Sequence, residues 1–280
     1  MTINEAYRTG IDMLKSNRIP DAEFDARCLL EFALDIEPTQ FFISRSELID
    51  DQKAEDYFTL INRRMNGEPL QYILGKWEFM SNEFCVGKGV LIPRPETEKL
   101  VELAKEYLTD IEKPVVVDLC SGSGCIAISI AKLIPDATVY AVEKYDDAFC
   151  YLTENISLNG VNNVVAVQGD LFDRELLRDV SADLIVSNPP YIRKADIETL
   201  SDEVKCEPVT ALDGGEDGYD FYRFISSYWL NEFLDKNGAV MVECAEDQGD
   251  YISELFSEYS EKIEIIYDFN GLQRIVTAYK

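Results

Sequence analysis

Four short apolar runs rich in β-branched residues constrain the fold of this chain more than any other feature. They are VVVDL, TVYAVE, VVAVQ and DLIVS, at residues 115–119, 138–143, 164–168 and 183–187. Segments long enough to form a helix separate the first three runs. Strands that alternate with helices are typical of a parallel sheet with crossover helices. The sequence therefore predicts an α/β fold from about residue 114 onward.

Three further apolar runs, at residues 238–244, 262–269 and 272–279, complete the chain. An Asn-Gly dipeptide separates the last two runs, and this dipeptide is a strong hairpin signal. We therefore expect at least one antiparallel strand near the C-terminus, in a sheet that is otherwise parallel.

The N-terminal part, residues 1–75, shows a helical pattern instead. Asp21 is a reasonable N-cap for a helix that carries Leu29, Phe32 and Ala33 on one side. A second helix has an apolar stripe at helical spacing and a plausible end at Gly67. That stripe comprises Ala54, Tyr57, Phe58, Ile61 and Met65. Residues 76–98 alternate aromatic and polar side chains around turn signals, which indicates a β-hairpin linker to a second domain at 99–280.

The chain contains no histidine, which excludes Ser-His-Asp and Cys-His catalysis and every zinc site that uses histidine. We expect no metal. The seven cysteines are scattered and form no C-x-x-C pair, so we expect free thiols in a reducing cytoplasm. No apolar run approaches the roughly 18 residues of a membrane span, and the polar, acidic N-terminus does not resemble a signal peptide.

The balance of 26 basic and 53 acidic residues gives a formal net charge of −27. Such a charge repels a phosphate backbone, so it argues against direct binding of nucleic acid. The acidic residues are dispersed, which is compatible with a plain solvated surface. A preference for a basic protein partner is the functional interpretation of the same charge.

A loop of small residues, Cys120 to Gly124, follows the first predicted strand and precedes a helix. Glycines there allow close approach of a ligand to backbone N–H groups. Glu143 ends the second strand 21 residues beyond Gly122, a spacing typical of a carboxylate that binds ribose hydroxyls. Asp170 follows the third strand and could meet the amino group of adenine. An ordinary turn explains each feature alone, but three successive strand ends together predict an adenosine-containing cofactor.

S-adenosylmethionine fits these features better than other adenosine cofactors. The loop lacks the third glycine of the G-x-G-x-x-G pattern that NAD usually requires, and the chain has no P-loop lysine.

The stretch SNPPYI, residues 187–192, follows the fourth predicted strand. Two prolines after a strand usually form only a turn. Here they would hold Asn188 extended and leave its side-chain oxygen and nearby carbonyls as acceptors beside the cofactor. Two such acceptors would orient a planar NH2 group and stabilise charge that develops on its nitrogen. The ring of Tyr191 could pack on the substrate or contact a sulfonium.

The motifs DLCSGSGCIA, AVEK, GDLF and VSNPPYI together resemble those of class I S-adenosylmethionine-dependent methyltransferases that methylate amino groups. GEPLQYILGKWEF, VLIPRPETEKLVELA and EPVTALDGGEDGYDFYR are similar to the bacterial peptide chain release factor glutamine methyltransferases (PrmC/HemK). The resemblance implies a Rossmann-like seven-stranded sheet, a small N-terminal helical domain that recognises substrate, and methylation of the glutamine in the Gly-Gly-Gln motif of release factors. S-adenosylhomocysteine would be the second product.

The resemblance also assigns roles to individual residues. Catalysis would involve Asn188, Pro189 and Tyr191. The cofactor-binding residues would be Asp118, Cys120, Ser121, Gly122, Ser123, Gly124, Glu143, Asp170, Leu171 and Asn188. The substrate would meet Asn188, Pro189, Pro190, Tyr191, Arg94 and Glu96.

Two residues depart from the family pattern. Cys120 stands where glycine is frequent, so we expect that its φ is not positive. Glu143 is longer than the commoner aspartate, so the ribose would sit slightly differently.

Three hypotheses about function follow. The first is a monomeric release factor glutamine methyltransferase. The second is a methyltransferase acting on a ribosomal-protein glutamine or on adenine N6 of nucleic acid, which uses a similar motif. The third is a cofactor-binding module without catalysis, and the intact Asn188–Tyr191 motif argues against it.

Overall fold

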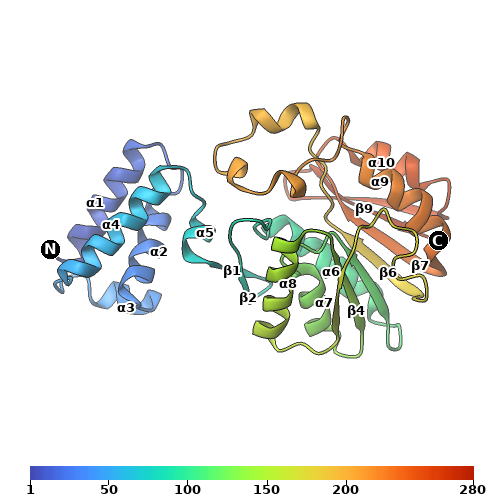
Figure 1. Cartoon of the computed structure of the whole chain (residues 1–280), viewed down its shortest axis with the longest axis horizontal. Helices are drawn as coiled ribbons and strands as arrows, with labels where there is room; N and C mark the ends of the chain where they lie inside the picture. The colour runs from blue at the N-terminus through green and yellow to red at the C-terminus, as the bar shows by residue number, and fades with distance from the viewer. The chain divides into compact units, whose positions relative to one another are not determined.

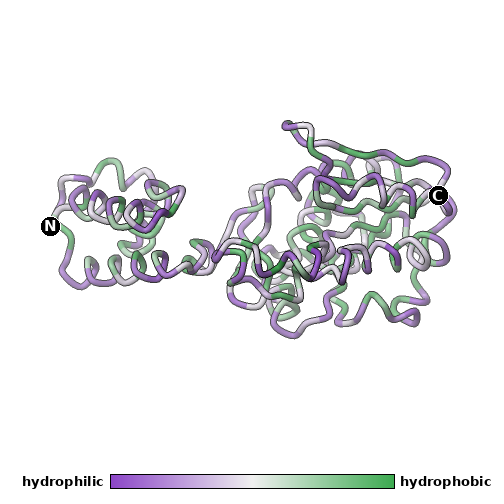
Figure 2. The backbone as a smooth tube through the Cα atoms, turned by 90° about the horizontal axis from the view of Figure 1, so that it is seen from above, coloured by the Kyte–Doolittle hydropathy of each residue, from purple (hydrophilic) through white to green (hydrophobic).

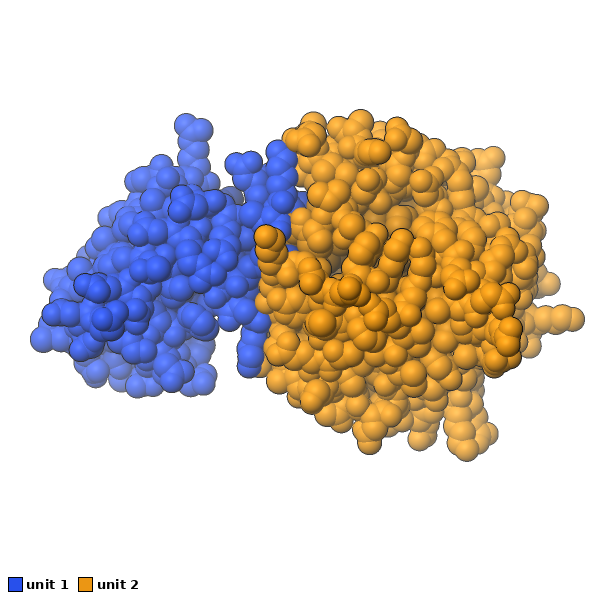
Figure 3. Space-filling model, viewed as in Figure 1, with its two compact units in different colours: residues 1–76, 201–206 blue, residues 77–200, 207–280 orange.

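The computed structural model describes all residues, 1–280, and divides into two compact units. Unit 1 comprises Met1–Lys76 with Ser201–Cys206, and unit 2 comprises Trp77–Leu200 with Glu207–Lys280 (Figure 3). No helix is both long enough and apolar enough to cross a membrane.

Unit 1 is a helical unit whose helices are amphipathic, and Figure 2 shows hydrophobic and hydrophilic residues alternating along them. A capping box between Thr2 and Glu5 starts the first helix. Asp50 accepts hydrogen bonds from the first turn of α4 (Asp51–Met65). That helix has Asn66 as its C-cap, and Gly67, the predicted end, follows with a positive φ. The helices are α1 (Ile3–Ser16), α2 (Ala22–Leu34), α3 (Pro38–Ile43), α4 (Asp51–Met65) and α5 (Leu70–Leu74).

The predicted apolar faces of unit 1 are partly right. Tyr57 and Ile61 of α4 are fully buried, and so is Leu29 of α2. Phe32 is 51% exposed, so the expectation that it shares the buried side of α2 is wrong. Asp21 does precede α2, but its side chain makes no capping hydrogen bond.

A buried ion pair joins two helices of unit 1. Arg64 Nε lies 2.6 Å from Asp25 Oδ2, and both side chains are almost completely buried. The same guanidinium donates to Glu203 Oε2 at 3.0 Å, which ties the segment 201–206 into this unit. Burial raises the pKa of Asp25, and the hydrogen bond from Arg64 opposes that rise.

The predicted hairpin follows unit 1 and is formed by β1 (Lys76–Phe79) and β2 (Asn82–Cys85). Met80 and Ser81 both have positive φ, as the tight turn of a two-residue hairpin requires. The hairpin takes up only the first part of residues 76–98, because a short helical turn, η1 (Pro95–Thr97), leads into α6. Glu98 accepts a hydrogen bond from the Met80 amide, so the start of α6 supports the hairpin turn.

The main sheet has seven strands in the order β5-β4-β3-β6-β7-β9-β8, and β9 alone runs opposite to the other strands. The predicted starts and ends of the first three strands are confirmed, as is the late antiparallel pair, while β7 starts earlier than predicted. The strands are β3 (Val115–Leu119), β4 (Thr138–Glu143), β5 (Val164–Gln168), β6 (Ala182–Ser187), β7 (Leu234–Glu243), β8 (Lys262–Tyr267) and β9 (Gln273–Tyr279).

Helices cover both faces of this sheet (Figure 1). Alternate residues of one strand point to opposite faces, so Val116 packs in one core cluster and Val117 in the other. One face packs on α6 (Glu98–Leu108), α7 (Cys125–Leu133) and α8 (Asp146–Asn159). The other packs on α9 (Asp220–Phe224), the π-type helix η5 (Ile225–Phe233) and α10 (Gly249–Phe256). Short 3₁₀ turns lie at η2 (Lys194–Thr199), η3 (Val204–Cys206) and η4 (Val209–Ala211).

The strand order reverses beside β3. The chain passes from β3 outward to β4 and β5, then returns to form β6 on the other side of β3. Open α/β sheets bind ligands in the crevice at the carboxyl ends of the strands at such a point. We therefore expect a ligand-binding site at the carboxyl ends of β3 and β6.

We expect Asp25→Asn to destabilise unit 1 by about 3 kcal/mol, because Arg64 would lose its buried counter-charge. Hydrogen exchange of the α2 and α4 amides in the full chain measures the loss. Asp21→Asn is the matched control, since that side chain makes no capping bond. Equal exchange in the two variants would contradict a structural role for the ion pair.

Candidate active site

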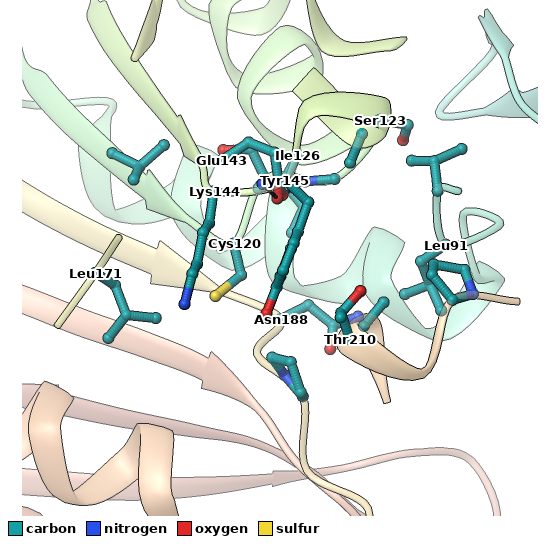
Figure 4. Close-up of a pocket in the computed structure, with 18 of the residues that line it drawn as sticks. Leu91, Cys120, Ser123, Ile126, Glu143, Lys144, Tyr145, Leu171, Asn188 and Thr210 are labelled. Carbon is teal, nitrogen blue, oxygen red and sulfur yellow. Dashed lines mark hydrogen bonds between the residues drawn. The ribbon is translucent and has the colours of Figure 1, made fainter. Parts of the chain in front are cut away.

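A pocket lies at the carboxyl ends of β3 to β6, within unit 2. Figure 4 shows Cys120 and Asn188 near its middle, with Leu171 on one side and Leu91 on the other. Its lining comes from four strand ends, from the segment before α6 and from the segment around η4. The lining includes Gly89–Leu91, Arg94, Thr97, Cys120–Ser123, Glu143–Tyr145, Gly169–Phe172, Asn188, Pro190, Pro208 and Thr210.

The small-residue loop forms a tight turn at the end of β3. Ser121 N donates to Val142 O of the neighbouring strand, and Gly124 N donates to Ser121 O. Gly124 has φ +79°, and a Cβ there would lie 2.5 Å from Leu152 Cδ1. Cys120 has φ +61°, so the expectation that its φ is not positive is wrong. The loop keeps the left-handed conformation of the usual glycine, at the cost of steric strain in a residue with a side chain.

Glu143 connects the loop to the end of β4. Its Oε2 accepts from Gly122 N at 2.9 Å and its Oε1 from Tyr145 N at 2.8 Å. The carboxyl group is buried and lines the pocket, and burial raises its pKa, while the backbone hydrogen bonds oppose that rise. A carboxylate held in this way retains lone pairs that can accept hydrogen bonds from a diol.

The end of β5 forms a partly aromatic wall of the pocket. Asp170 Oδ1 accepts from Phe172 N, and Asp170 Oδ2 lies 2.8 Å from Lys144 Nζ. Leu171 is buried, and the ring of Phe172 stands 5.3 Å from that of Phe221. A planar heterocycle would fit between such apolar side chains and the carboxylate.

Asp118, near the end of β3, and Gly124, the last residue of the loop, do not line the pocket. The Asp118 carboxyl is fully buried, and its Oδ2 accepts from Ala127 N in the first turn of α7. Its Oδ1 has no hydrogen-bond partner. Burial raises the pKa of Asp118 to about 7, although the hydrogen bond from Ala127 N opposes the rise.

Asn188 reaches the pocket from the end of β6. Its Nδ2 donates to Thr97 Oγ1 at 3.3 Å, and Thr97 Oγ1 donates to Glu243 Oε2 at 2.6 Å. Neither Asn188 Oδ1 nor the Pro189 carbonyl accepts a hydrogen bond from the protein. Two oxygens without a protein partner therefore lie at this strand end, and Asn188 itself lines the pocket.

The residues of the N-P-P-Y motif that follow Asn188 are held in place by contacts on the core side of the motif. Pro190 lines the pocket, Pro189 is buried, and Tyr191 packs against the core cluster instead of lining the pocket. Burial raises the pKa of the Tyr191 phenol to about 12. Gln248 Nε2 donates to the Tyr191 carbonyl at 3.0 Å. A Cβ at Gly214 would lie 2.8 Å from Tyr191 Cα, and one at Gly218 would lie 2.6 Å from the Tyr191 carbonyl oxygen, so these two glycines of the D-G-G-E-D-G stretch pack on the motif backbone.

Only some residues of the R-P-E-T-E segment line the pocket. Arg94 lines the pocket and pairs with Glu207, a buried carboxylate that also accepts from Ile92 N at 3.0 Å. Glu96 is exposed and does not line the pocket. Sequence reasoning missed Thr97, Glu207 and Glu243 as individual residues. The first two lie inside motifs that the resemblance used, whereas Glu243 gave no signal beyond a carboxylate at the end of an apolar run.

The sheet order, the glycine loop at the end of β3 and the N-P-P-Y motif at the end of β6 define a class I methyltransferase. The catalytic domain of hMettl16, solved in complex with MAT2A 3′UTR hairpin 6, shares this fold at a TM-score of 0.56 and 15% identity, over 82% of each chain.

Comparison with known proteins identifies the family. The chain is 37% identical to the release factor glutamine methyltransferase of Clostridium acetobutylicum, over 99% of this chain and 98% of the relative. It is 36% identical to that of Thermodesulfovibrio yellowstonii, over 91% and 92%. Residues 5–75 match the PrmC N-terminal domain, and residues 98–210 match the TRM5/TYW2 methyltransferase domain. The chain belongs to the release factor glutamine methyltransferase family.

The raised pKa of Asp118 predicts a pH-dependent stability difference. The native carboxyl keeps its proton up to about pH 7, while the unfolded chain releases it near 3.8, so this group destabilises the fold increasingly as pH rises through that window. Asp118→Asn cannot ionise. Its free energy of unfolding relative to wild type should therefore rise between about pH 4 and 7. Urea unfolding at several pH values measures this, with the exposed Asp110→Asn as control. Parallel curves for wild type and Asp118→Asn would contradict the assignment.

Proposed function

We propose that this protein transfers a methyl group from S-adenosylmethionine to the side-chain amide nitrogen of the glutamine in the Gly-Gly-Gln motif of peptide chain release factors. The observation that carries the proposal is the pair of free acceptors, Asn188 Oδ1 and the Pro189 carbonyl, at a pocket with a buried carboxylate and a glycine loop. The names of the relatives supply the acceptor, because they describe release factor glutamine methyltransferases.

The residues along the pocket support the proposed cofactor. Glu143 would accept hydrogen bonds from the ribose hydroxyls, and Asp170 with Leu171 would flank the adenine. The loop Cys120–Gly124 would hold the methionine part, because the space beside Gly122 is open: a Cβ there would meet only Val90 Cγ2, at 3.9 Å. When bound, the cofactor supplies an electrophilic methyl group on a sulfonium. No cluster of residues suited to a metal ion is present.

Asn188 and Pro189 would act on the substrate amide by orientation. An amide nitrogen is a weak nucleophile because its lone pair is delocalised. Two oxygens that accept its two hydrogens would hold the NH2 group facing the methyl and stabilise positive charge that develops on nitrogen. In the proposed transfer the nitrogen would bond to the methyl carbon, the electron pair of the carbon–sulfur bond would stay on sulfur, and one proton would pass from nitrogen to water.

The remaining substrate residues have supporting roles in this proposal. Pro190 would contact the substrate at the pocket wall, and Arg94, held by Glu207, would border its entrance. Tyr191 would keep the motif rigid from the core side. Glu96 is exposed, so a contact with substrate would lie outside the pocket.

The partner and the compartment of the reaction can be proposed from the net charge, the N-terminal unit and the cysteines. We propose that unit 1 recognises the release factor, that the chain acts as a monomer in the cytoplasm, and that it binds no nucleic acid. The net charge of −27 supports a partner with a basic protein surface, because such a surface is attracted to the acidic chain. The same charge repels the phosphate backbone of a nucleic acid. The seven cysteines form no disulfide, which suits a reducing compartment.

Label mapping tests the proposed reaction. Purified release factor, incubated with the protein and methyl-labelled S-adenosylmethionine, should carry label in the Gly-Gly-Gln peptide, while ribosomal proteins, DNA and RNA should not. Asn188→Ala should bind the cofactor as wild type does but lose roughly 100-fold or more in turnover, because one acceptor of the amide is removed. Label elsewhere, or unchanged turnover in Asn188→Ala, would refute the proposal.

Salt dependence tests the role of the acidic surface. We expect KM for the release factor to rise by roughly tenfold between about 50 and 300 mM salt, because screening removes long-range attraction, while kcat stays constant. An uncharged Gly-Gly-Gln peptide is the matched control and should show no such rise. A KM for the release factor that does not depend on salt would argue against steering.

A further inference from the structure

A buried carboxylate stands next to the N-P-P-Y motif without any role in the reaction described above. The parallel register of β6 and β7 pairs Ser187 with Val242, so the residues that follow, Asn188 and Glu243, lie side by side at the carboxyl ends of the two strands. Glu243 is only 4% exposed. A buried carboxylate is costly unless it is hydrogen-bonded, and its partner here is Thr97.

Thr97 links Glu243 to Asn188, and the Asn188 side chain also acts directly on Glu243 by opposing the rise in its pKa that burial causes. A hydroxyl has one hydrogen to donate, and Thr97 Oγ1 gives it to Glu243 Oε2 at 2.6 Å. Only lone pairs then face Asn188, 3.3 Å away, so they accept from its Nδ2 and would repel its Oδ1. The two ends of an asparagine amide have nearly the same shape, and the hydrogen-bond partner decides which end points where.

We propose that Glu243 and Thr97 are positioning residues that set the orientation of the Asn188 amide, so that its oxygen and not its NH2 group faces the substrate. The proposal rests on the proposed function, because the reversed amide matters only for an acceptor that is itself an NH2 group. A reversed Asn188 would present hydrogens to the hydrogens of the substrate amide and would block its binding in the reactive pose.

The neighbours of Thr97 explain why it can serve in this way. Its backbone N–H donates to Arg94 O within the η1 turn, and its side chain is buried where α6 begins. The R-P-E-T-E segment therefore places one hydroxyl between Asn188 and Glu243, at the carboxyl ends of β6 and β7. Thr97 therefore has a role in this segment that does not require contact with the substrate.

Protonation of Glu243 would reverse the arrangement. A protonated carboxyl could donate to Thr97 Oγ1, and the hydroxyl hydrogen would then be free to bond Asn188 Oδ1. Burial raises the pKa of Glu243 to about 7, the nearby Glu96 adds to the rise, and Thr97, Arg274 and Asn188 oppose it. Tyr191, Tyr222, Cys125 and Cys244 are the other titratable groups facing this carboxyl, each with a raised pKa.

Turnover and its pH profile test the proposal on the full chain with release factor as substrate. Wild-type kcat should fall as pH drops through about 7, since the ionised carboxylate is the active form. Thr97→Val should lose roughly 10- to 100-fold in kcat and keep its cofactor Kd. Its kcat should no longer fall as the pH drops below about 7, so the acid limb of the pH profile should disappear. Thr97→Ser should restore both kcat and the limb, and Glu243→Gln should abolish the limb. Thr109→Val, at the far exposed end of α6, is the matched control and should behave as wild type.

A second measurement does not depend on turnover. The side-chain NH2 resonances of Asn188, assigned by their loss in Asn188→Ala, should shift with pH near 7 in wild type and Thr97→Ser but not in Thr97→Val or Glu243→Gln. Absence of that shift in wild type, or an acid limb that persists in Thr97→Val, would overturn the inference. If the resonances behave as expected but the wild-type protein labels no release factor, the proposed function is overturned and the inference about the Asn188 orientation is not.

Discussion

The parallel pairing of β3 with β6 is the constraint on which the site depends. It places Leu119 opposite Ser187, and the Ser187 hydroxyl donates to the Leu119 carbonyl at 2.7 Å. The glycine loop and the N-P-P-Y motif begin at the next residue of each strand, so this register alone brings them together. A slip of one residue would turn every side chain of β6 to the opposite face of the sheet, so the two hydrophobic cores enforce the register.

Buried polar side chains fix the loops that the sheet leaves free. Asn155 of α8 bonds the backbone of Cys85 in the hairpin and donates to Ser123 O in the glycine loop. Glu207 holds Arg94 and the amide of Ile92, and Glu243 holds Thr97. Each of these groups is costly to bury alone, so each one selects the loop conformation that satisfies it. These buried contacts attach the hairpin, the segment before α6 and the glycine loop to the rest of unit 2.

Much of the fold could be predicted from the sequence, because the strands and crossover helices follow from local periodicity. The runs at 115–119, 138–143 and 164–168 match the strands residue for residue. The loop, Glu143 and Asn188 were also identifiable, since each directly follows or ends a strand. The positive φ of Cys120 was not, because its side chain argued against a conformation that the surrounding hydrogen bonds enforce. Tyr191 was expected in the pocket on chemical grounds, yet it does not line the pocket and packs against the core cluster.

The sequence by itself determined which chemical groups end each strand: a glycine loop, a carboxylate and an amide followed by two prolines. It did so because β-strand and turn signals are local, and the carboxyl ends of parallel strands share one edge. Only the tertiary structure decided which groups meet across the chain. Asn188, Thr97 and Glu243 come from three distant segments, and Glu203 joins Arg64 from a loop far along the chain. Such contacts depend on strand register and on the cost of burying charge, which no short stretch of sequence contains.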